Sequence, residues 1–259
     1  MDAIAGIASP CAARPKEGAK VFIIEGEIAA GKTELAKALA EELRRRGLKV
    51  ALVLEPVERW RKIGILSKFY GAPGRHGYGF QTYVFATRVL EITAAVAAEP
   101  DADVYLLERS PATDMIFMEL QRELVDPVEM EMYATWCESF RLMLPIDLSK
   151  AKVLYLKTSL GSCMSRLAER RREGEVAEIG KSDASATGGV SVEYQARLRR
   201  AHEAFFQGLH PAEFPGLPAS PFPLESVVEI EPALADGDFR DAGPDRDRIV
   251  AAIVRKMGF

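Results

Sequence analysis

Short apolar runs alternate with longer amphipathic stretches along most of the chain. Runs typical of buried strands lie at residues 21–24, 49–54, 103–107, 153–156 and 226–230. Apolar residues recur at the spacing of one helix face in the stretches at 34–46, 58–69, 81–97, 112–143, 192–207 and 246–257. Strands that alternate with helices predict a parallel sheet of five strands covered on both faces, which is a three-layer α/β/α fold.

Glycine and proline indicate where this pattern is interrupted. The Gly-rich residues 71–79 are expected to separate two helices, and Asp126-Pro127 is expected to break the helical stretch at 112–143. Residues 173–190 are rich in Gly, Ser, Ala and acids and show no periodicity. We therefore predict a mobile loop there.

Length and composition limit the kind of protein. The 259 residues suffice for one α/β core, so we expect a disordered lead-in at residues 1–19 and a single domain at 20–259. A net charge of −4 gives no electrostatic basis for binding a nucleic-acid polymer. No apolar run approaches the ~18 residues of a membrane span, so no membrane contact is expected. Three widely spaced cysteines suit a reducing compartment, which predicts a cytoplasmic protein, with a mitochondrial location as the alternative.

One segment carries a phosphate-binding motif. Residues 26–33 read Gly-Glu-Ile-Ala-Ala-Gly-Lys-Thr, follow the first predicted strand and open the first predicted helix. Lys32 contributes a mobile positive charge, and the Thr33 hydroxyl can bind Mg²⁺. Phosphate oxygens are expected to meet the backbone N–H groups of Gly26, Ala29, Ala30 and Gly31. The motif predicts a nucleoside triphosphate ligand.

Charged residues follow the second and third predicted strands. Glu55 comes after the second strand, and Glu108 and Arg109 come after the third. Parallel strands bring these residues to the same rim as the phosphate loop. A carboxylate there can hold Mg²⁺ or take a proton from an attacking hydroxyl, and a fixed arginine favours phosphoryl transfer. The alternatives are carboxylates that stabilise a helix N-terminus and an arginine in a structural salt bridge.

A basic helix precedes the expected loop. Arg166 and Arg170 lie four residues apart and share a helix face, and Arg172 lies further along. A solvated charged face is the ordinary interpretation of such a pattern. Because a long loop follows, we predict a helical lid at about residues 166–190 whose arginines close over the triphosphate in catalysis.

Taken together, these residues resemble the deoxynucleoside kinases, a family of P-loop kinases. The resemblance also rests on Glu55-Pro56-Val57 with Trp60, on Tyr70, on Phe80-Gln81-Thr82-Tyr83, on Glu108-Arg109-Ser110 and on Val192-Glu193-Tyr194. It implies transfer of the γ-phosphate of ATP to the 5′-hydroxyl of a deoxynucleoside, in salvage of DNA precursors. It also implies a homodimer packed through long helices, for which the segments at 82–97 and 112–143 are candidates.

The resemblance implies roles for the charged residues. Glu55 would act as the general base on the 5′-hydroxyl, and Arg109 would place that hydroxyl and the moving phosphate. Thr33 and Glu108 would hold Mg²⁺. Lys32 belongs to the same catalytic set.

The resemblance also assigns residues to the sugar and to the donor base. Tyr70 and an acid of the lid, most nearly Glu175, would bind the 3′-hydroxyl. Phe239 would stack on the adenine of ATP, or it would simply cap the core.

The nucleobase site is expected on one helix face. Gln81 and Arg88 lie seven residues apart, two helical turns, and Phe80 and Trp60 are available as apolar walls. The set of Gln81, Arg88 and Asp114 resembles the one found in the deoxycytidine and deoxyguanosine kinases.

An ionised Asp114 held by Arg88 would accept a hydrogen bond from an exocyclic amine and repel O4 of thymine. Leaving buried polar groups unpaired costs about 1–3 kcal/mol, which predicts at least tenfold discrimination in favour of a purine deoxynucleoside or deoxycytidine over thymidine. The alternative is a purely structural salt bridge between Arg88 and Asp114.

Two departures and two rival functions remain open from the sequence. Glu27 stands in the phosphate loop where relatives often have Asn, and an acid there must point away from the triphosphate or be paired. The lid is longer than is usual in the family.

A nucleoside monophosphate kinase, such as a thymidylate kinase, shares the sheet and the loop, although it usually has Asp-Arg where this chain has Glu108-Arg109. A non-catalytic nucleotide-binding scaffold is the other alternative.

Overall fold

A computed structural model describes residues 13–170 and 189–259 of the chain. Its strands form one five-stranded sheet in the order β2-β3-β1-β4-β5, and every neighbouring pair is parallel. The strands are β1 (Lys20–Gly26), β2 (Val50–Val53), β3 (Val104–Glu108), β4 (Lys152–Leu156) and β5 (Val227–Ile230). The prediction of a parallel five-stranded sheet is confirmed.

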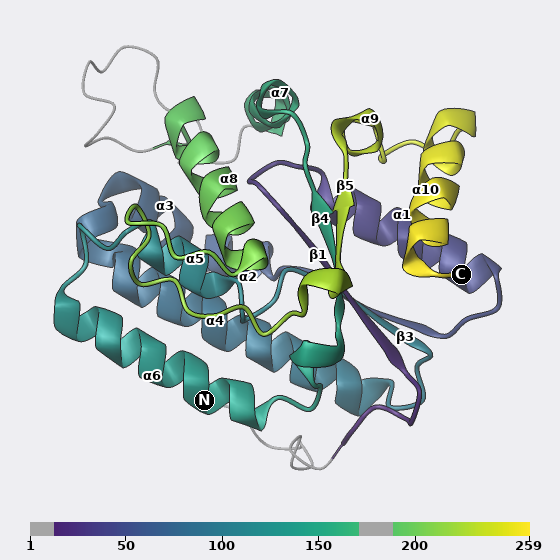
Figure 1. The fold of residues 1–259 in the computed structure, drawn as a ribbon, viewed down its shortest axis with the longest axis horizontal. Coiled ribbons are helices and arrows are strands. Elements are labelled where there is room, and N and C mark those ends of the chain that lie inside the picture. The colour runs from purple at the N-terminus through teal and green to yellow at the C-terminus, as the bar shows by residue number, and fades with distance from the viewer. Residues whose placement is uncertain (1–12, 171–188) are drawn as a thin grey trace.

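Helices cover both faces of this sheet (Figure 1). They are α1 (Lys32–Arg45), α2 (Val57–Lys62), α3 (Ile65–Gly71), α4 (Pro73–Ala98), α5 (Asp114–Glu119), α6 (Pro127–Met143), α7 (Leu160–Arg170), α8 (Val192–Gln207), α9 (Pro232–Ala235) and α10 (Pro244–Met257). One buried apolar cluster joins the sheet to α1 and α10, and a second joins its other face to α4, α6 and α8. The fold is therefore the predicted three-layer arrangement of a P-loop kinase.

The Gly-rich segment is mostly helical: α3 ends at Gly71 and α4 begins at Pro73, so the expected separation of two helices falls at Ala72 alone and not over the whole stretch at 71–79. Helix α4 begins at Pro73. Proline has no backbone N–H, but the N–H of the first helical residue makes no bond within the helix, so none is lost. At Gly77, an added Cβ would lie 2.4 Å from the side-chain oxygen of Gln121. The absence of a side chain there allows α4 to pass close to the chain after α5. A further break lies at Gly64, whose φ of 74° separates α2 from α3.

The predicted break at Asp126-Pro127 is confirmed, because α6 begins at Pro127. The Asp126 carboxylate accepts a hydrogen bond from the backbone N–H of Val128 at 2.8 Å, and Glu129 completes a capping box. These bonds satisfy N–H groups that the first turn of a helix leaves without partners. The two helical pieces on either side of the break are therefore separate elements.

The described part of the expected lead-in, residues 13–19, contacts the domain. The Arg14 guanidinium donates to the carbonyl oxygen of Leu144 at 2.9 Å, and Lys16 pairs with Asp103 at 2.5 Å. The remainder of the lead-in, residues 1–12, lies outside the described residues. Of the helices that the structure describes, not one has both the length and the apolar character needed to cross a bilayer.

Candidate active site

A cavity of about 880 Å³ lies at the carboxyl ends of β1, β2 and β3. The structure brings the predicted site residues together there: all those that it describes, except Gly26, line this cavity. They are Ala29, Ala30, Gly31, Lys32, Thr33, Glu55, Trp60, Tyr70, Phe80, Gln81, Arg88, Glu108, Arg109, Asp114, Arg166, Arg170 and Phe239. Arg172 and Glu175 lie outside the described residues.

The phosphate loop wraps tightly between β1 and α1. Ala29 and Gly31 have φ values of 62° and 98°, in the left-handed region where successive N–H groups turn toward one side and form an anion cradle. An added Cβ at Gly26 would lie 2.9 Å from the carbonyl oxygen of Leu156, so the loop leaves no room for a side chain there. This shape fits a bound polyphosphate.

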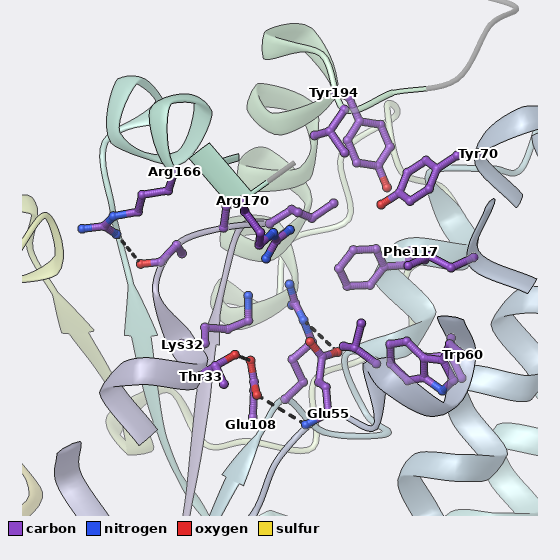
Figure 2. Close-up of a pocket in the computed structure, with 18 of the residues that line it drawn as sticks. Lys32, Thr33, Glu55, Trp60, Tyr70, Glu108, Phe117, Arg166, Arg170 and Tyr194 are labelled. Carbon is purple, nitrogen blue, oxygen red and sulfur yellow. Dashed lines mark hydrogen bonds and ion pairs between the residues drawn. The ribbon is translucent and has the colours of Figure 1, made fainter. Parts of the chain in front are cut away.

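The Lys32 ammonium lies under the loop. Figure 2 shows this side chain pointing into the cavity. It donates to the carbonyl oxygens of Glu27 at 2.8 Å and Gly26 at 3.3 Å. Burial, together with the charge of Arg109, lowers the pKa of Lys32 to about 8. A buried ammonium held mainly by neutral carbonyls gains most from an anionic ligand, so its setting also fits a triphosphate.

Thr33 and Glu108 form an oxygen pair at the end of the loop. The Thr33 hydroxyl donates to Glu108 Oε1 at 2.6 Å, and the backbone N–H of Glu55 donates to Glu108 Oε2 at 3.3 Å. Burial and the neighbouring Glu55 charge raise the pKa of Glu108. One hydroxyl and one carboxylate, completed by phosphate oxygens, are ligands that suit Mg²⁺.

Five charged side chains form a continuous series of ion pairs across the floor of the cavity. Arg109 pairs with Glu25 at 3.0 Å and with Glu55 at 3.4 Å. Arg88 pairs with Glu55 at 2.9 Å and with Asp114 at 3.0 Å. Negative and positive groups alternate from Glu25 to Asp114, and each guanidinium serves two carboxylates.

The two acids of the cavity that flank Arg88 differ in their titration. Burial alone would raise the pKa of Glu55, but Arg88, Arg109 and Lys32 outweigh it and lower this pKa to about 2. For Asp114, burial outweighs the attraction of Arg88 and raises the pKa to about 6. Glu55 is therefore ionised at every physiological pH, whereas Asp114 takes up a proton in mildly acidic solution.

Glu25 is a site residue that the sequence reasoning missed. Its carboxylate is fully buried on β1, accepts from the backbone N–H of Ser110 at 3.1 Å and also accepts from the Thr113 hydroxyl. These bonds hold the chain where Arg109 adopts a left-handed φ of 63°, which is uncommon for a residue with a side chain. A charged residue inside an otherwise apolar central strand was the available signal.

His202 lies behind Glu25 and was also missed. Its Nε2 atom is 3.7 Å from Glu25 Oε2, and its Nδ1 atom lies 2.9 Å from the carbonyl oxygen of Leu198. Burial works against the charge of Glu25, but His202 and Arg109 outweigh it and lower the pKa of Glu25. The acid is thus held as the anion that Arg109 needs.

Apolar side chains form the opposite wall of the cavity. Trp60 and Phe80 pack edge to face, and Phe80 stacks on Phe69 with the ring centres 4.5 Å apart. Phe117, on α5, lies under the Arg109 guanidinium at 4.7 Å. These rings line the same cavity as the Arg88–Asp114 pair.

Two tyrosines face each other across the cavity (Figure 2). Tyr70 was predicted as a site residue, whereas Tyr194, on α8, was noted only as part of the resemblance. Burial raises the pKa of Tyr194 to about 12, so its hydroxyl stays protonated. The Tyr194 hydroxyl can therefore donate as well as accept a hydrogen bond at this side of the cavity.

The predicted lid arginines lie differently from each other. Arg166 donates to the carbonyl oxygens of Ala30 at 2.8 Å, Asp236 at 2.8 Å and Gly237 at 2.9 Å, on the outer side of the phosphate loop. Arg170 lies above Lys32 in the cavity (Figure 2). Arg166 therefore ties the phosphate loop to the chain at Asp236 and Gly237.

Phe239 occupies a position between the cavity and the core. It is 3% exposed and belongs to the apolar cluster on the α1 side of the sheet. Its ring packs against Gly31, where an added Cβ would lie 3.6 Å from a ring carbon of Phe239. This burial is typical of a core side chain. It favours the alternative that Phe239 caps the core.

Comparison with known proteins agrees with the geometry. A family model described as deoxynucleoside kinase matches residues 22–257. A probable deoxycytidine kinase of fowlpox virus is 30% identical over 240 residues, which cover 90% of this chain and 86% of the relative. Mitochondrial thymidine kinase 2 of Macaca fascicularis is 28% identical over 95% of this chain and 83% of its own. Deoxycytidine kinase 2 of Gallus gallus is 26% identical over 70% of this chain and 72% of its own.

The different settings of the two acids can be measured by carboxyl ¹³C NMR in a pH titration. We expect a midpoint near pH 6 for Asp114, because burial favours its protonated form. An Arg88→Met substitution should raise this midpoint further and should also raise that of Glu55, since both lose a guanidinium. Exposed Asp101, whose pKa Lys49 lowers, is the internal control and should not move. A midpoint at or below 3.8 for Asp114 would mean that burial does not favour its protonated form.

The same titration has a consequence for stability. The folded state binds the Asp114 proton up to about pH 6, whereas the unfolded chain releases it near 3.8. Between these values the folded state holds more protons, so this group lowers the free energy of unfolding as the pH rises.

Proposed function

The chain belongs to the deoxynucleoside kinase family and is an ATP-dependent deoxynucleoside kinase, and we propose that it favours a purine deoxynucleoside or deoxycytidine over thymidine. The observation that carries this preference is the buried Arg88–Asp114 pair, at 3.0 Å, in the same cavity as the phosphate loop. The relatives include both deoxycytidine and thymidine kinases, so the preference rests on the residues of the cavity. Membership of the family removes the support for a monophosphate kinase or a scaffold.

For the acceptor, we propose that Glu55 receives the 5′-hydroxyl. Both guanidiniums approach the same carboxylate oxygen, Oε1, and Oε2 is then the oxygen offered to the hydroxyl proton. The low pKa of Glu55 makes it a weak base. In a loose phosphoryl-transfer transition state the proton leaves late, so orientation of the hydroxyl matters more than basicity. Arg109 contacts Glu55 and would place both the hydroxyl and the moving phosphate.

For the donor, we propose that the loop backbone and Lys32 hold the phosphates of ATP. Arg170 lies above Lys32, and this position supports a role for it in approaching the transferred group. Thr33 and Glu108 would hold Mg²⁺. The ion would supply charge neutralisation between the phosphates. Arg166 would act by fixing the Ala30 carbonyl, which keeps the loop in shape.

For the acceptor base, we propose that Asp114 accepts a hydrogen bond from an exocyclic amine while Arg88 fixes its orientation. Gln81 is 3% exposed and lies two turns before Arg88 on α4, so it would contact the same edge of the base. Phe117 and Trp60 would enclose the ring. On the sugar side, Tyr70 and Glu175 remain the proposed 3′-hydroxyl ligands, and Glu175 lies outside the described residues.

We also propose that the protein is a homodimer. Helix α6 presents three large apolar side chains at four-residue spacing, Val128, Met132 and Trp136, which are 66%, 45% and 45% exposed. They line a shallow groove on this helix, which lies at the outside of the molecule (Figure 1). Exposed apolar residues on one face of a helix are typical of an interface with another chain. A cytoplasmic location stays the prediction from the sequence.

A Glu55→Gln substitution tests the acceptor site. It keeps the size of the side chain but removes the proton acceptor, so kcat should fall by about 10²–10⁴. Binding of ATP should be unchanged. Steady-state kinetics with each of the four deoxynucleosides, together with ATP titration, measure both quantities. Glu58→Gln is the matched control, because Glu58 is 82% exposed three residues away and pairs only with Arg61 among the described ion pairs. A kcat close to that of the wild type would remove Glu55 from this role.

Apolar replacement of the Arg88–Asp114 pair tests how the base is recognised. The double variant Arg88→Met/Asp114→Ala removes both charges together, so neither is left buried without its partner. We expect the ratio of kcat/KM for thymidine to that for deoxycytidine to rise at least about tenfold. The control is Arg200→Met/Glu213→Ala, which removes an exposed ion pair and should leave the ratio unchanged. An unchanged ratio in the Arg88–Asp114 variant would mean that the base is recognised elsewhere.

A charge placed on α6 tests the proposed dimer. Light scattering after size exclusion should give twice the chain mass of 28.5 kDa for the wild type. Trp136→Glu should shift the protein to monomers, since a carboxylate at an apolar interface is costly to desolvate. Leu224→Glu, at a 65% exposed residue before β5, is the control and should remain dimeric. A monomeric wild type would reject the proposal.

A further inference from the structure

Glu27 places a fully buried acid in the phosphate loop. Its backbone carbonyl accepts the 2.8 Å hydrogen bond from Lys32, which anchors the residue beside the site of the phosphates. A carboxylate there would repel an incoming triphosphate, because charges are poorly screened away from water. Its charge therefore has to be balanced by a group behind the loop.

Arg199, on α8, is placed to balance it. Its Nε atom donates to Glu27 Oε1 at 2.7 Å, and the Tyr155 hydroxyl donates to the same oxygen at 3.2 Å. Arg199 also donates to the carbonyl oxygen of Thr158, whose hydroxyl donates to the carbonyl oxygen of Ala30 at 2.9 Å. The guanidinium thus contacts one end of the loop directly and the other end through Thr158.

A neutral tether accompanies this ion pair. Gln195 lies one helical turn before Arg199 on the same face of α8 and is fully buried. Its side-chain oxygen accepts from the backbone N–H of Ile28 at 3.1 Å, and its amide nitrogen donates to the Ile28 carbonyl oxygen at 2.7 Å. These two bonds hold the loop on α8 without using charge. The loop therefore does not need Arg199 in order to be attached to α8, which leaves charge balance as the distinct contribution of that residue.

We propose that Arg199 is a positioning residue for the donor triphosphate and acts through Glu27. The guanidinium cancels the loop carboxylate, so that the field at the phosphates comes from Lys32, Arg170 and the backbone N–H groups. This inference rests on the proposed binding of ATP at the loop. It predicts that removing the two charges one at a time has different effects on the affinity for ATP. Removing the cation weakens ATP binding, whereas removing the anion preserves or strengthens it. A bridge with only a structural role would weaken ATP binding in both cases.

Calorimetric titration with ATP and Mg²⁺, without a deoxynucleoside, separates these two roles. Arg199→Met keeps the aliphatic part of the side chain, and we expect it to raise the Kd for ATP about tenfold or more. Glu27→Gln should leave this Kd unchanged or lower it. The double variant Glu27→Gln/Arg199→Met should return to within about threefold of the wild type, since both charges are gone. Arg199→Lys keeps the charge and should also stay within about threefold.

Controls keep the outcome clear. Thermal melting establishes that each variant is folded, and deoxycytidine titration, which should be unchanged, reports on the acceptor side. Arg200→Met, at the next residue of α8 and in an exposed pair with Glu213, should leave the Kd for ATP unchanged. A higher Kd in both single variants, or an unchanged Kd in Arg199→Met, overturns the inference. If Arg199→Met does not fold, a raised Kd in Glu27→Gln or in Arg199→Lys overturns it equally. A wild type that fails to bind ATP would instead reject the proposed function.

Discussion

The alternating series of charges from Glu25 to Asp114 is the constraint on which the rest of the site depends. Each of its five members comes from a different part of the chain: β1, the residues after β2, helix α4, the residue after β3, and helix α5. Removing one partner of a buried ion pair typically costs about 3–5 kcal/mol, because the other charge is left uncompensated. The series can therefore exist only when all five elements are in register, and the parallel sheet supplies that register.

Much of this arrangement follows from the sequence because it depends on local spacing and on a rule of topology. The carboxyl ends of parallel strands lie at one rim, so Glu55, Glu108 and Arg109 had to meet the phosphate loop. Gln81 and Arg88 share a face because seven residues are two helical turns. Asp114 carries no such geometric signal, and only the resemblance to a family indicated it. The roles of these residues remain proposals, whereas their common location is a feature of the structure.

The features that the sequence did not reveal depend on contacts between distant segments. Arg199 and Gln195, the partners of Glu27 and Ile28 on α8, lie 172 and 167 residues further along, and no periodicity links them to the loop. Glycine is a poor helix former, yet the segment at 71–79 lies largely in α4, because tertiary packing of Gly77 against Gln121 outweighs local propensity. Arg166 shares a helix face with Arg170, but the carbonyls of Asp236 and Gly237, from a distant loop, determine where its guanidinium lies.

In the mechanism that we propose, the shared charges explain how a phosphate approaches a carboxylate. Glu55 is an anion, and the transferred group is also negative, so their meeting at one hydroxyl is unfavourable in a poorly solvated cavity. Two guanidiniums on the same oxygen of Glu55 reduce this repulsion, and by the same interaction they lower its pKa to about 2. The two guanidiniums that let the phosphate approach Glu55 therefore also make Glu55 a weak base. A reaction in which the hydroxyl loses its proton late tolerates a weak base, so phosphoryl transfer is compatible with this compromise.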